Sequence, residues 1–427
     1  MLRLYLLIFS LLILSCRKGS ESTGPSNPNN PPMITFVKNY DAFYDDFPTF
    51  AQKTSDGGFI IAGYTFKEYS GIGEYDILLI KIDSGGTVQW AKTYGGLSDY
   101  EYAHAVSETS DGGFIIVGTY IIKTDANGNI QWAKYGGDLY SVQQTNDGGY
   151  IIAGYTSFFG PDEDILLIKM DASGNVQWAK TYGGTGYDKA YAVQQTSDDG
   201  YIFAGLTTSF VDSVDYCEIF LAKTDANGNL QWFKTYKQVR RNPYSRLSLQ
   251  KTNDGGYVLL YSGFLIKTDA NGNVLWAKRY NTYGSYGTYS IQQTNDGGFI
   301  IGEMDEDWTY LLYSVVIKTD ASGNIQWAKY YSQGGATFAQ QTNDNGFIIL
   351  VYRLKGDFTG DILLIKTDDK GSVRGCAGSG TDVSVYNPTL NVEDSPITTN
   401  SISITPSNIS LTTTNLNLTP QDKCSAQ

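Results

Sequence analysis

Several stretches of this 427-residue chain hold aromatic and acidic side chains close together. Aromatic rings stack on the apolar faces of sugars and peptides, and carboxylates accept hydrogen bonds from their polar groups. The candidate ligand-binding residues of this kind are Tyr69, Tyr75, Phe158, Phe159, Asp162, Glu163, Asp305, Asp307, Trp308 and Tyr310. We therefore predict a binding role for these segments. The alternative is that they only shield the ends of the structural elements that they connect.

Catalytic machinery is sparse. Glycoside hydrolysis needs two carboxylates roughly 5 to 9.5 Å apart. Sequence alone does not show which glutamates approach each other among Glu74, Glu163, Glu218, Glu303 and Glu306. His104 is the sole histidine, so a Ser-His-Asp triad or a His-rich zinc site would have to rest on it. We assign no catalytic residue and regard an enzyme as the less favoured hypothesis.

Metal and cofactor binding are not predicted. Asp125, Asn127 and Asn129 have a faint calcium-loop spacing, but no acidic residue closes the coordination shell. Gly and Asn accept positive φ, and Asp caps a turn with its side chain, so these residues are expected to form a plain turn. No set of residues that would dock a cofactor is evident.

A pattern that recurs seven times organises the chain. Its first half is a Thr-x-Asp-Gly-Gly turn between apolar runs, as in Thr145 to Gly149, with degenerate copies at 196–200 and 342–346. Its second half is an apolar run ending in Lys-x-Asp, a Gly turn, and a run with Trp two places before Lys, as in 165–182. Each half predicts strand, turn, strand.

Four short strands per unit predict an all-β fold, a seven-bladed β-propeller of four-stranded blades. The seventh unit lacks its Trp strand, because Gly375 stands at the Trp position. The segment Thr35 to Tyr40 has the register of that strand, with Phe36 at the Trp position. We expect this N-terminal strand to close the last blade and remove the exposed sheet edges. An open solenoid is the alternative.

The repeat resembles those of bacterial and archaeal β-propeller proteins that read Trp-x-x-Tyr-x-Gly-Gly, then Asp, then Asp-Gly-Gly-Phe. Trp178 to Gly184 with Asp188 is the closest copy, and the resemblance covers roughly residues 33–376. The piece from Asp171 to Trp178 is also similar to the repeat of quinoprotein alcohol dehydrogenases. The resemblance implies a propeller fold and leaves a quinone-dependent dehydrogenase as a further alternative, although the repeat explains the tryptophans structurally.

The order of the strands gives the predicted propeller two unlike faces. The first-to-second and third-to-fourth strand turns lie on one face and are nearly uniform in sequence. The other connections lie on the opposite face and carry the sequence variety. Trp308 is the one tryptophan outside the repeat. We expect ligand binding on the variable face.

The lysines that follow each Trp could form a functional ring: Lys92, Lys134, Lys180, Lys234, Lys278 and Lys329. Alternation places each on the strand face of its Trp, where the stem packs on the ring. A structural ladder, with each charge reaching an acid, is the favoured interpretation.

The first 16 residues have the pattern of a secretory signal, with a charged Arg3 followed by an apolar run that is too short to span a bilayer. Ile13-Leu14-Ser15-Cys16 resembles the lipobox of bacterial lipoproteins, which implies lipidation of Cys16. Ordinary signal cleavage nearby is the alternative. Residues 17–32 suit a flexible tether, and residues 33–377 the propeller. We expect a cell-surface or outer-membrane location with a lipid anchor as the only membrane contact.

Residues 378–427 are rich in Ser, Thr and Asn, with an apolar beat about every seven residues. Ile402 and Ile404, Ile409 and Leu411, and Leu416 and Leu418 mark this beat. An extended strand array and a disordered stalk both fit it. In an oxidising compartment Cys376 and Cys424 are expected to form a disulfide. Cys217 is then odd, and we expect it to be buried.

A net charge of -13 and a pI of about 4.6 make nucleic acid an improbable partner. The favoured function is a non-catalytic, monomeric envelope lipoprotein whose propeller binds a glycan or a protein. The alternatives are a carbohydrate-active enzyme, a quinoprotein-like dehydrogenase and a purely structural envelope component.

Overall fold

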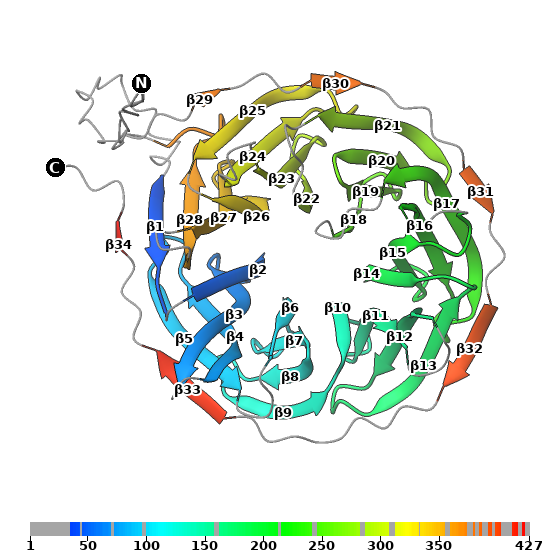
Figure 1. Cartoon of the computed structure of the whole chain (residues 1–427), viewed down its shortest axis with the longest axis horizontal. Helices are drawn as coiled ribbons and strands as arrows, with labels where there is room; N and C mark the ends of the chain where they lie inside the picture. Colours follow the sequence, from blue (N-terminus) through cyan, green and yellow to red (C-terminus); the bar gives the residue numbers. More distant parts are fainter. Residues whose placement is uncertain are drawn as a thin grey trace, which may run out of the picture.

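The computed structural model describes residues 35–42, 45–69, 72–95, 100–157, 162–211, 215–240, 246–281, 287–306, 312–332, 334–354 and 359–373. In the tail it describes only short strands between residues 379 and 422. The described residues form an all-β, seven-bladed propeller, which confirms the predicted fold class (Figure 1). None of them forms a helix that could cross a membrane.

The blades follow the chain, each an antiparallel sheet ordered from the central channel outwards. Blade 1 contains β2 (Asp45–Lys53), β3 (Phe59–Tyr69), β4 (Ile72–Ile82) and β5 (Val88–Gly95). Blade 2 contains β6 (Ala103–Glu108), β7 (Phe114–Gly118), β8 (Tyr120–Thr124) and β9 (Ile130–Tyr135). Blade 3 contains β10 (Asp138–Gln144), β11 (Tyr150–Thr156), β12 (Asp164–Met170) and β13 (Val176–Gly183). Blade 4 contains β14 (Asp188–Gln195), β15 (Tyr201–Thr207), β16 (Tyr216–Thr224) and β17 (Leu230–Arg240).

The remaining blades repeat this order. Blade 5 contains β18 (Ser248–Lys251), β19 (Tyr257–Tyr261), β20 (Phe264–Thr268) and β21 (Val274–Asn281). Blade 6 contains β22 (Gly287–Gln293), β23 (Phe299–Glu306), β24 (Leu312–Thr319) and β25 (Ile325–Ser332). Blade 7 contains β26 (Gly335–Gln341), β27 (Phe347–Leu354), β28 (Gly360–Thr367) and the N-terminal β1 (Phe36–Tyr40).

The N-terminal strand closes the ring as predicted. β1 pairs antiparallel with β28 from Phe36↔Lys366 to Tyr40↔Ile362. The hydroxyl of Tyr40 donates to the carbonyl of Gly86 in blade 1 at 2.7 Å. The same tyrosine-to-glycine bond joins five other neighbouring pairs of blades, through Tyr94, Tyr182, Tyr236, Tyr280 and Tyr331. Closure therefore uses the same contact as the rest of the ring.

The hydrophobic core lies between the blades. The middle strands are apolar without alternation, as in β7, where all five residues are buried. Such runs are expected when both faces of a strand are covered. Among the described residues the buried apolar side chains form seven clusters, each between two neighbouring blades. Cys217 is buried in one of them, as expected, and its thiol donates to the hydroxyl of Tyr261 at 3.9 Å.

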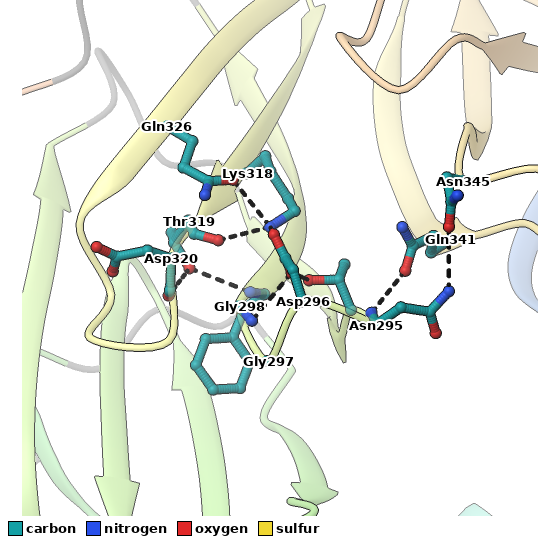
Figure 2. Close-up of polar contacts among 12 residues, drawn as sticks. Asn295, Asp296, Gly297, Gly298, Lys318, Thr319, Asp320, Gln326, Gln341 and Asn345 are labelled. Carbon is teal, nitrogen blue, oxygen red and sulfur yellow. Dashed lines mark hydrogen bonds and ion pairs between the residues drawn. The ribbon is translucent and has the colours of Figure 1, made fainter.

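The uniform face is built from the Thr-x-Asp-Gly-Gly turn, which Figure 2 shows in blade 6. Asp296 accepts from the backbone N–H of Gly298 at 3.1 Å and from the ammonium of Lys318 at 2.8 Å. The backbone N–H of Asn295 donates to the side-chain oxygen of Gln341 in blade 7 at 2.8 Å. The turn thus binds its own lysine and the next blade at once, which explains its repetition by structure alone.

The same ion pair recurs in every blade, as Lys81–Asp56, Lys123–Asp111, Lys169–Asp147, Lys223–Asp198, Lys267–Asp254, Lys318–Asp296 and Lys366–Asp344. Burial would raise the pKa of the Asp111 carboxyl, but hydrogen bonds from Lys123, Thr109 and Gly113 outweigh it and lower that pKa to about 2. Because the unfolded pKa is near 3.8, this stabilisation is complete above about pH 4 and is lost as the pH falls towards 2.

We predict that Asp111→Asn lowers the free energy of unfolding by about 1–2 kcal/mol at pH 7, because the buried ammonium of Lys123 loses its charged partner. The carboxylate is half exposed, which keeps the effect at the lower end for an ion pair. Urea unfolding of both proteins from pH 7 to pH 2 measures it. The difference should shrink below pH 4, and a pH-independent difference would contradict the proposed cause.

Candidate ligand-binding face

The face that carries the variable loops also carries a connected set of aromatic side chains around the channel. We call the following residues the aromatic band: Phe47, Tyr64, Tyr75, Tyr100, Tyr102, His104, Tyr140, Tyr155, Tyr191 and Tyr352. They come from blades 7, 1, 2, 3 and 4, and they stand near the ends of the strands that lead into the variable loops.

The rings of the band follow one another at stacking distance. Tyr352 and Phe47 stack with their centroids 4.5 Å apart, and Phe47 stacks on Tyr64 at 4.8 Å. Tyr64 meets Tyr102 edge-on at 4.7 Å. His104 is parallel to Tyr140 at 4.6 Å with an interplanar angle of 2°. Such contacts fix the rings, which lowers the entropy cost of presenting them to a ligand.

β-bulges direct three of these side chains. The pairing of the innermost strand with its neighbour shifts by one residue at the same place in blades 2, 3 and 4. The extra residues are His104, Tyr140 and Tyr191. A bulge re-aims the side chain of its extra residue, and here all three line the channel. The same bulge recurs in blades 1, 6 and 7, and in blades 2, 3 and 4 it brings an aromatic ring or a histidine to the channel.

The channel has a volume of about 350 Å³ and runs between the inner strands. Its described lining holds the bulge residues, Arg246 and a set of glutamines, serines and aliphatic residues, and none of these lining residues is Asp or Glu. A hydrolase that uses two carboxylates would need such acids in the cavity. The described lining therefore offers aromatic rings, one guanidinium and neutral hydrogen-bonding groups to a ligand.

His104 contributes a polar ring to the channel lining. Its Nδ1 is buried and has no hydrogen-bond partner among the described residues. Burial, reinforced by the charge of Arg246, holds the pKa of His104 well below its usual value. The ring is therefore neutral at physiological pH, with one nitrogen able to accept and the other to donate a hydrogen bond.

Arg246 brings a cation to the same place. Its guanidinium carbon lies 5.2 Å from the centroid of the Tyr140 ring, a cation–π distance. Although it belongs to the segment leading into blade 5, its charge opposes the effect of burial on the pKa of Tyr64 in blade 1 as well as that of Tyr140. A positive charge in a chain of net charge -13 is thus held at the channel by the aromatic band.

The structure places three of the ten predicted site residues with their side chains. Tyr75 belongs to the band and contacts Tyr64, Phe66, Tyr100 and Tyr102. Glu163 pairs with Lys189 at 2.5 Å, and Lys189 lies 3.9 Å above the ring of Tyr155. Asp162, next to Glu163, is half-buried. Tyr75 is thus part of the band, and Glu163 lies beside it through Lys189.

The side chains of the other seven predicted residues lie outside what the structure describes. The backbone of Tyr69 pairs with Ile72 at the end of β3, and that of Asp305 with Tyr313 in β23. Phe158, Phe159, Asp307, Trp308 and Tyr310 lie outside the described residues, as do Cys16, Cys376 and Cys424. Sequence reasoning missed Arg246 and the bulge residues. The available signal was an aromatic residue or histidine five places before the repeat threonine, as in Tyr140 and Thr145.

Two further sets of residues prove to be structural. Asp164 and Asp188 flank Gly183 between blades 3 and 4, where any side chain on that glycine would meet Asp164 within 2 Å. Burial raises the pKa of both carboxyls, but Asp188 is wholly buried and accepts from the N–H of Gly184 at 2.9 Å. This explains the Tyr182-Gly183-Gly184…Asp188 part of the repeat as a bond between blades.

The lysine ladder is structural with one correction. Lys180 lies 6.0 Å from the centroid of the Trp178 ring, as expected, but its ammonium donates to the amide oxygen of Asn229 in the next blade at 2.8 Å. Lys92, Lys234 and Lys278 do the same with Asn129, Asn273 and Asn324. We expected an acid at this place. Instead, the side-chain amide of each asparagine donates a hydrogen bond to an Asp of its own turn, as Asn229 does to Asp225 at 2.8 Å.

Comparison with known proteins supports no assignment beyond the fold. No protein-family model and no curated protein matches the sequence. Similar solved structures include the Dos1 propeller, 12% identical with a TM-score of 0.48 over 78% of this chain and 96% of that one. A protein of unknown function from Dyadobacter fermentans is 11% identical with a TM-score of 0.42 over 78% of this chain and 98% of that one. β-1,2-Mannobiose phosphorylase from Listeria innocua is 12% identical, with a TM-score of 0.31 over 77% and 96%.

Fold and site together describe a seven-bladed β-propeller with aromatic side chains and the cation of Arg246 at its channel.

Proposed function

We propose that this protein is a non-catalytic binding scaffold of the cell envelope, and that its aromatic band takes a glycan carrying a carboxylate group. The observation that supports this most is the combination at the channel of stacked rings, the buried unpartnered Nδ1 of His104 and the cation of Arg246. Rings of this kind stack on sugar faces, and a guanidinium pairs with a carboxylate in a bidentate manner. The anchor at the envelope rests on the lipobox-like residues 13–16.

An enzyme has less support. Of the acids that hydrolysis would draw on, Glu218 and Glu303 are buried within strands β16 and β23, and Glu163 is paired with Lys189. A quinone cofactor would have to bind in a channel whose described lining is, apart from Arg246 and a few aromatic rings, mainly glutamine, serine and aliphatic side chains. A protein ligand is the alternative to a glycan, because aromatic rings and arginine also anchor protein interfaces.

We predict that the double variant Tyr140→Ala/Tyr191→Ala loses at least about tenfold in affinity for its glycan, since two channel rings are removed and each stacking contact is worth about 1 kcal/mol. The matched control is Leu275→Ala, which removes an exposed apolar side chain from the outer strand of blade 5. A glycan array of acidic and neutral sugars, probed with residues 33–427, followed by calorimetry on each hit, measures the effect.

The array also separates the alternatives. If no glycan binds, and pull-down recovers a protein that the double variant no longer binds, the ligand is a protein and not a glycan. Silence in both assays would leave a structural envelope component. Release of reducing sugar from an acidic glycan would instead establish an enzyme.

A further inference from the structure

The tail adds a fifth strand to the outer edges of the blades. Six short strands, β29 (Ser379–Gly380), β30 (Ser384–Tyr386), β31 (Val392–Asp394), β32 (Thr398–Ile402), β33 (Thr412–Leu416) and β34 (Gln421–Asp422), pair with the outermost strands of blades 6, 5, 4, 3, 1 and 7. Figure 1 shows them in orange and red around the rim. We call these six strands the belt. It favours the extended strand array over the disordered stalk.

The belt runs round the ring in the direction opposite to the chain of the propeller, from blade 6 back through blade 1 and on to β1. Among the described residues, only blade 2 has no belt strand, although β33 follows β32 past its position. None of the described strands pairs with the outer edge of β9, and the edge of a sheet is where a further strand can add.

The pairings have a fixed period. In five blades a belt residue pairs with the ladder lysine, whose position in β1 is held by Lys38. The pairs are Gly380 with Lys329, Asp394 with Lys234, Ser401 with Lys180, Asn415 with Lys92 and Asp422 with Lys38. In blade 5, Tyr386 pairs with Arg279, one residue from Lys278, which is the same frame and puts position 387 opposite the lysine. Neighbouring blades are thus seven tail residues apart, and blades separated by one other are fourteen apart. Seven extended residues reach at most about 25 Å, which is enough for one step between outer edges.

The sequence of the tail has the same period. Residues at this seven-residue spacing are small and polar, acidic or glycine throughout: Gly380, Asn387, Asp394, Ser401, Asn408, Asn415 and Asp422. Three residues after each of the first six stands an aliphatic residue: Val383, Leu390, Ile397, Ile404, Leu411 and Leu418. Asn408 and Leu411 fit this pattern as well as their neighbours do. The unit that belongs to blade 2 is therefore present in the sequence.

We propose that the tail is a seven-unit belt with one seven-residue unit per blade, and that residues 405–411 add the fifth strand to β9 with Asn408 opposite Lys134. The occupant of this edge is the chain's own tail, because the strands on both sides of it, β32 and β33, fix where residues 405–411 begin and end. The binding site is on the rim and is separate from the ligand-binding face.

Blade 2 departs from the repeat at its outer strand, β9. In the other units one residue separates this lysine from the tyrosine, whereas Lys134 is followed directly by Tyr135 and two glycines. β9 consequently has six residues where β5 and β13 have eight, and Tyr135 is 53% exposed while Tyr94 and Tyr182 are wholly buried. β9 thus offers fewer pairing positions than the outer strands of blades 1 and 3.

Cysteine pairs test the register. In the full chain with Cys376 and Cys424 replaced by Ser, the pair Lys134→Cys/Asn408→Cys should form a disulfide under mild oxidation, as should the positive control Lys92→Cys/Asn415→Cys. The pair Lys134→Cys/Ser401→Cys shifts the tail partner by one unit and should remain reduced. Intact-mass and peptide analysis after proteolysis identifies the bonds.

Hydrogen exchange of the protein without introduced cysteines gives a second readout. We expect the amides of β9 that point away from β8 to exchange at least tenfold more slowly in the full chain than in residues 33–377, as those of β5 and β13 do. A disulfide in the shifted pair, none in the Lys134/Asn408 pair while the control pair forms, or equally fast exchange of β9 in both chains would each overturn the proposal.

Discussion

Removing residues 33–41 is expected to destabilise the propeller more than any other change of similar size. These residues hold β1, which supplies the outer strand of blade 7 and pairs with five residues of β28. Tyr40 is 1% exposed and bonds blade 7 to blade 1, and the side chain of Asn39 donates to Asp361 at 2.8 Å. Loss of a buried aromatic residue alone costs about 3–5 kcal/mol, and the deletion also opens two sheet edges.

We expect chain 42–427 to be recovered mainly as aggregate, and its soluble fraction to unfold at a urea concentration well below that of chain 33–427. A synthetic peptide of residues 33–42 should restore the transition when it is added in excess, because binding to the folded state stabilises it by mass action. The control peptide carries Asn39→Ala and Tyr40→Ala and should restore little. An unchanged transition in chain 42–427 would show that the belt alone closes the ring.

At the junction of blades 7 and 1, hydrogen bonds to both blades close the ring. The backbone N–H of Ala42, just after β1, donates to Asp46 of blade 1 at 2.6 Å, and Thr65 donates to the other oxygen of that carboxylate at 2.5 Å. Asp46 and Asp361 are both buried, and with Asp41 they place one oxygen each within 4.8 Å of one another. The first residues of the propeller are thus tied to blade 7 through Asn39 and to blade 1 through Tyr40 and Ala42.

The sequence predicted the blades well because each repeats a local pattern. Turn residues, an apolar run and the Trp-x-Lys strand recur seven times, so an error in one copy is corrected by the others. Closure was predictable for the same reason, since Phe36, Lys38 and Tyr40 match the positions of Trp, Lys and Tyr in the missing strand. The period of the tail was visible, but its partners were not, because strand pairing between distant segments leaves no local signal.

The centre of the site was much harder to predict, because its geometry depends on a β-bulge in the inner strands. A β-bulge inserts one residue without changing the pattern of residue types, so Tyr140 and Tyr191 were not separable from core tyrosines. Arg246 reaches the channel from a segment that precedes the inner strand of blade 5 and meets residues more than a hundred positions away. Reasoning from composition instead favoured the long loops, which adjoin the band at Tyr75 and Glu163.

The second large effect concerns the affinity for the acidic ligand, which should fall about 10- to 100-fold in Arg246→Gln. A charge-assisted hydrogen bond is worth about 1.5–3 kcal/mol, and glutamine keeps polarity and part of the length while removing the charge and the planar fork. Arg246→Lys should restore only part of the loss, because an ammonium cannot pair with a carboxylate in a bidentate manner. Calorimetry at two salt concentrations measures the effect, since the loss should be larger at low salt.

The control for this variant is Arg279→Gln, which makes the same chemical change at another stacked arginine. The Arg279 guanidinium carbon lies 4.7 Å from the centroid of Phe264, and its strand pairs with the belt and lies away from the channel. The ligand affinity of this variant should equal that of the unaltered protein. Because burial keeps His104 neutral, the affinity of the unaltered protein should also be constant between about pH 6 and 8. Equal losses in both arginine variants would place the acidic ligand on the rim, whereas an unchanged affinity in Arg246→Gln would remove the carboxylate from the proposed ligand and leave a neutral glycan on the aromatic band.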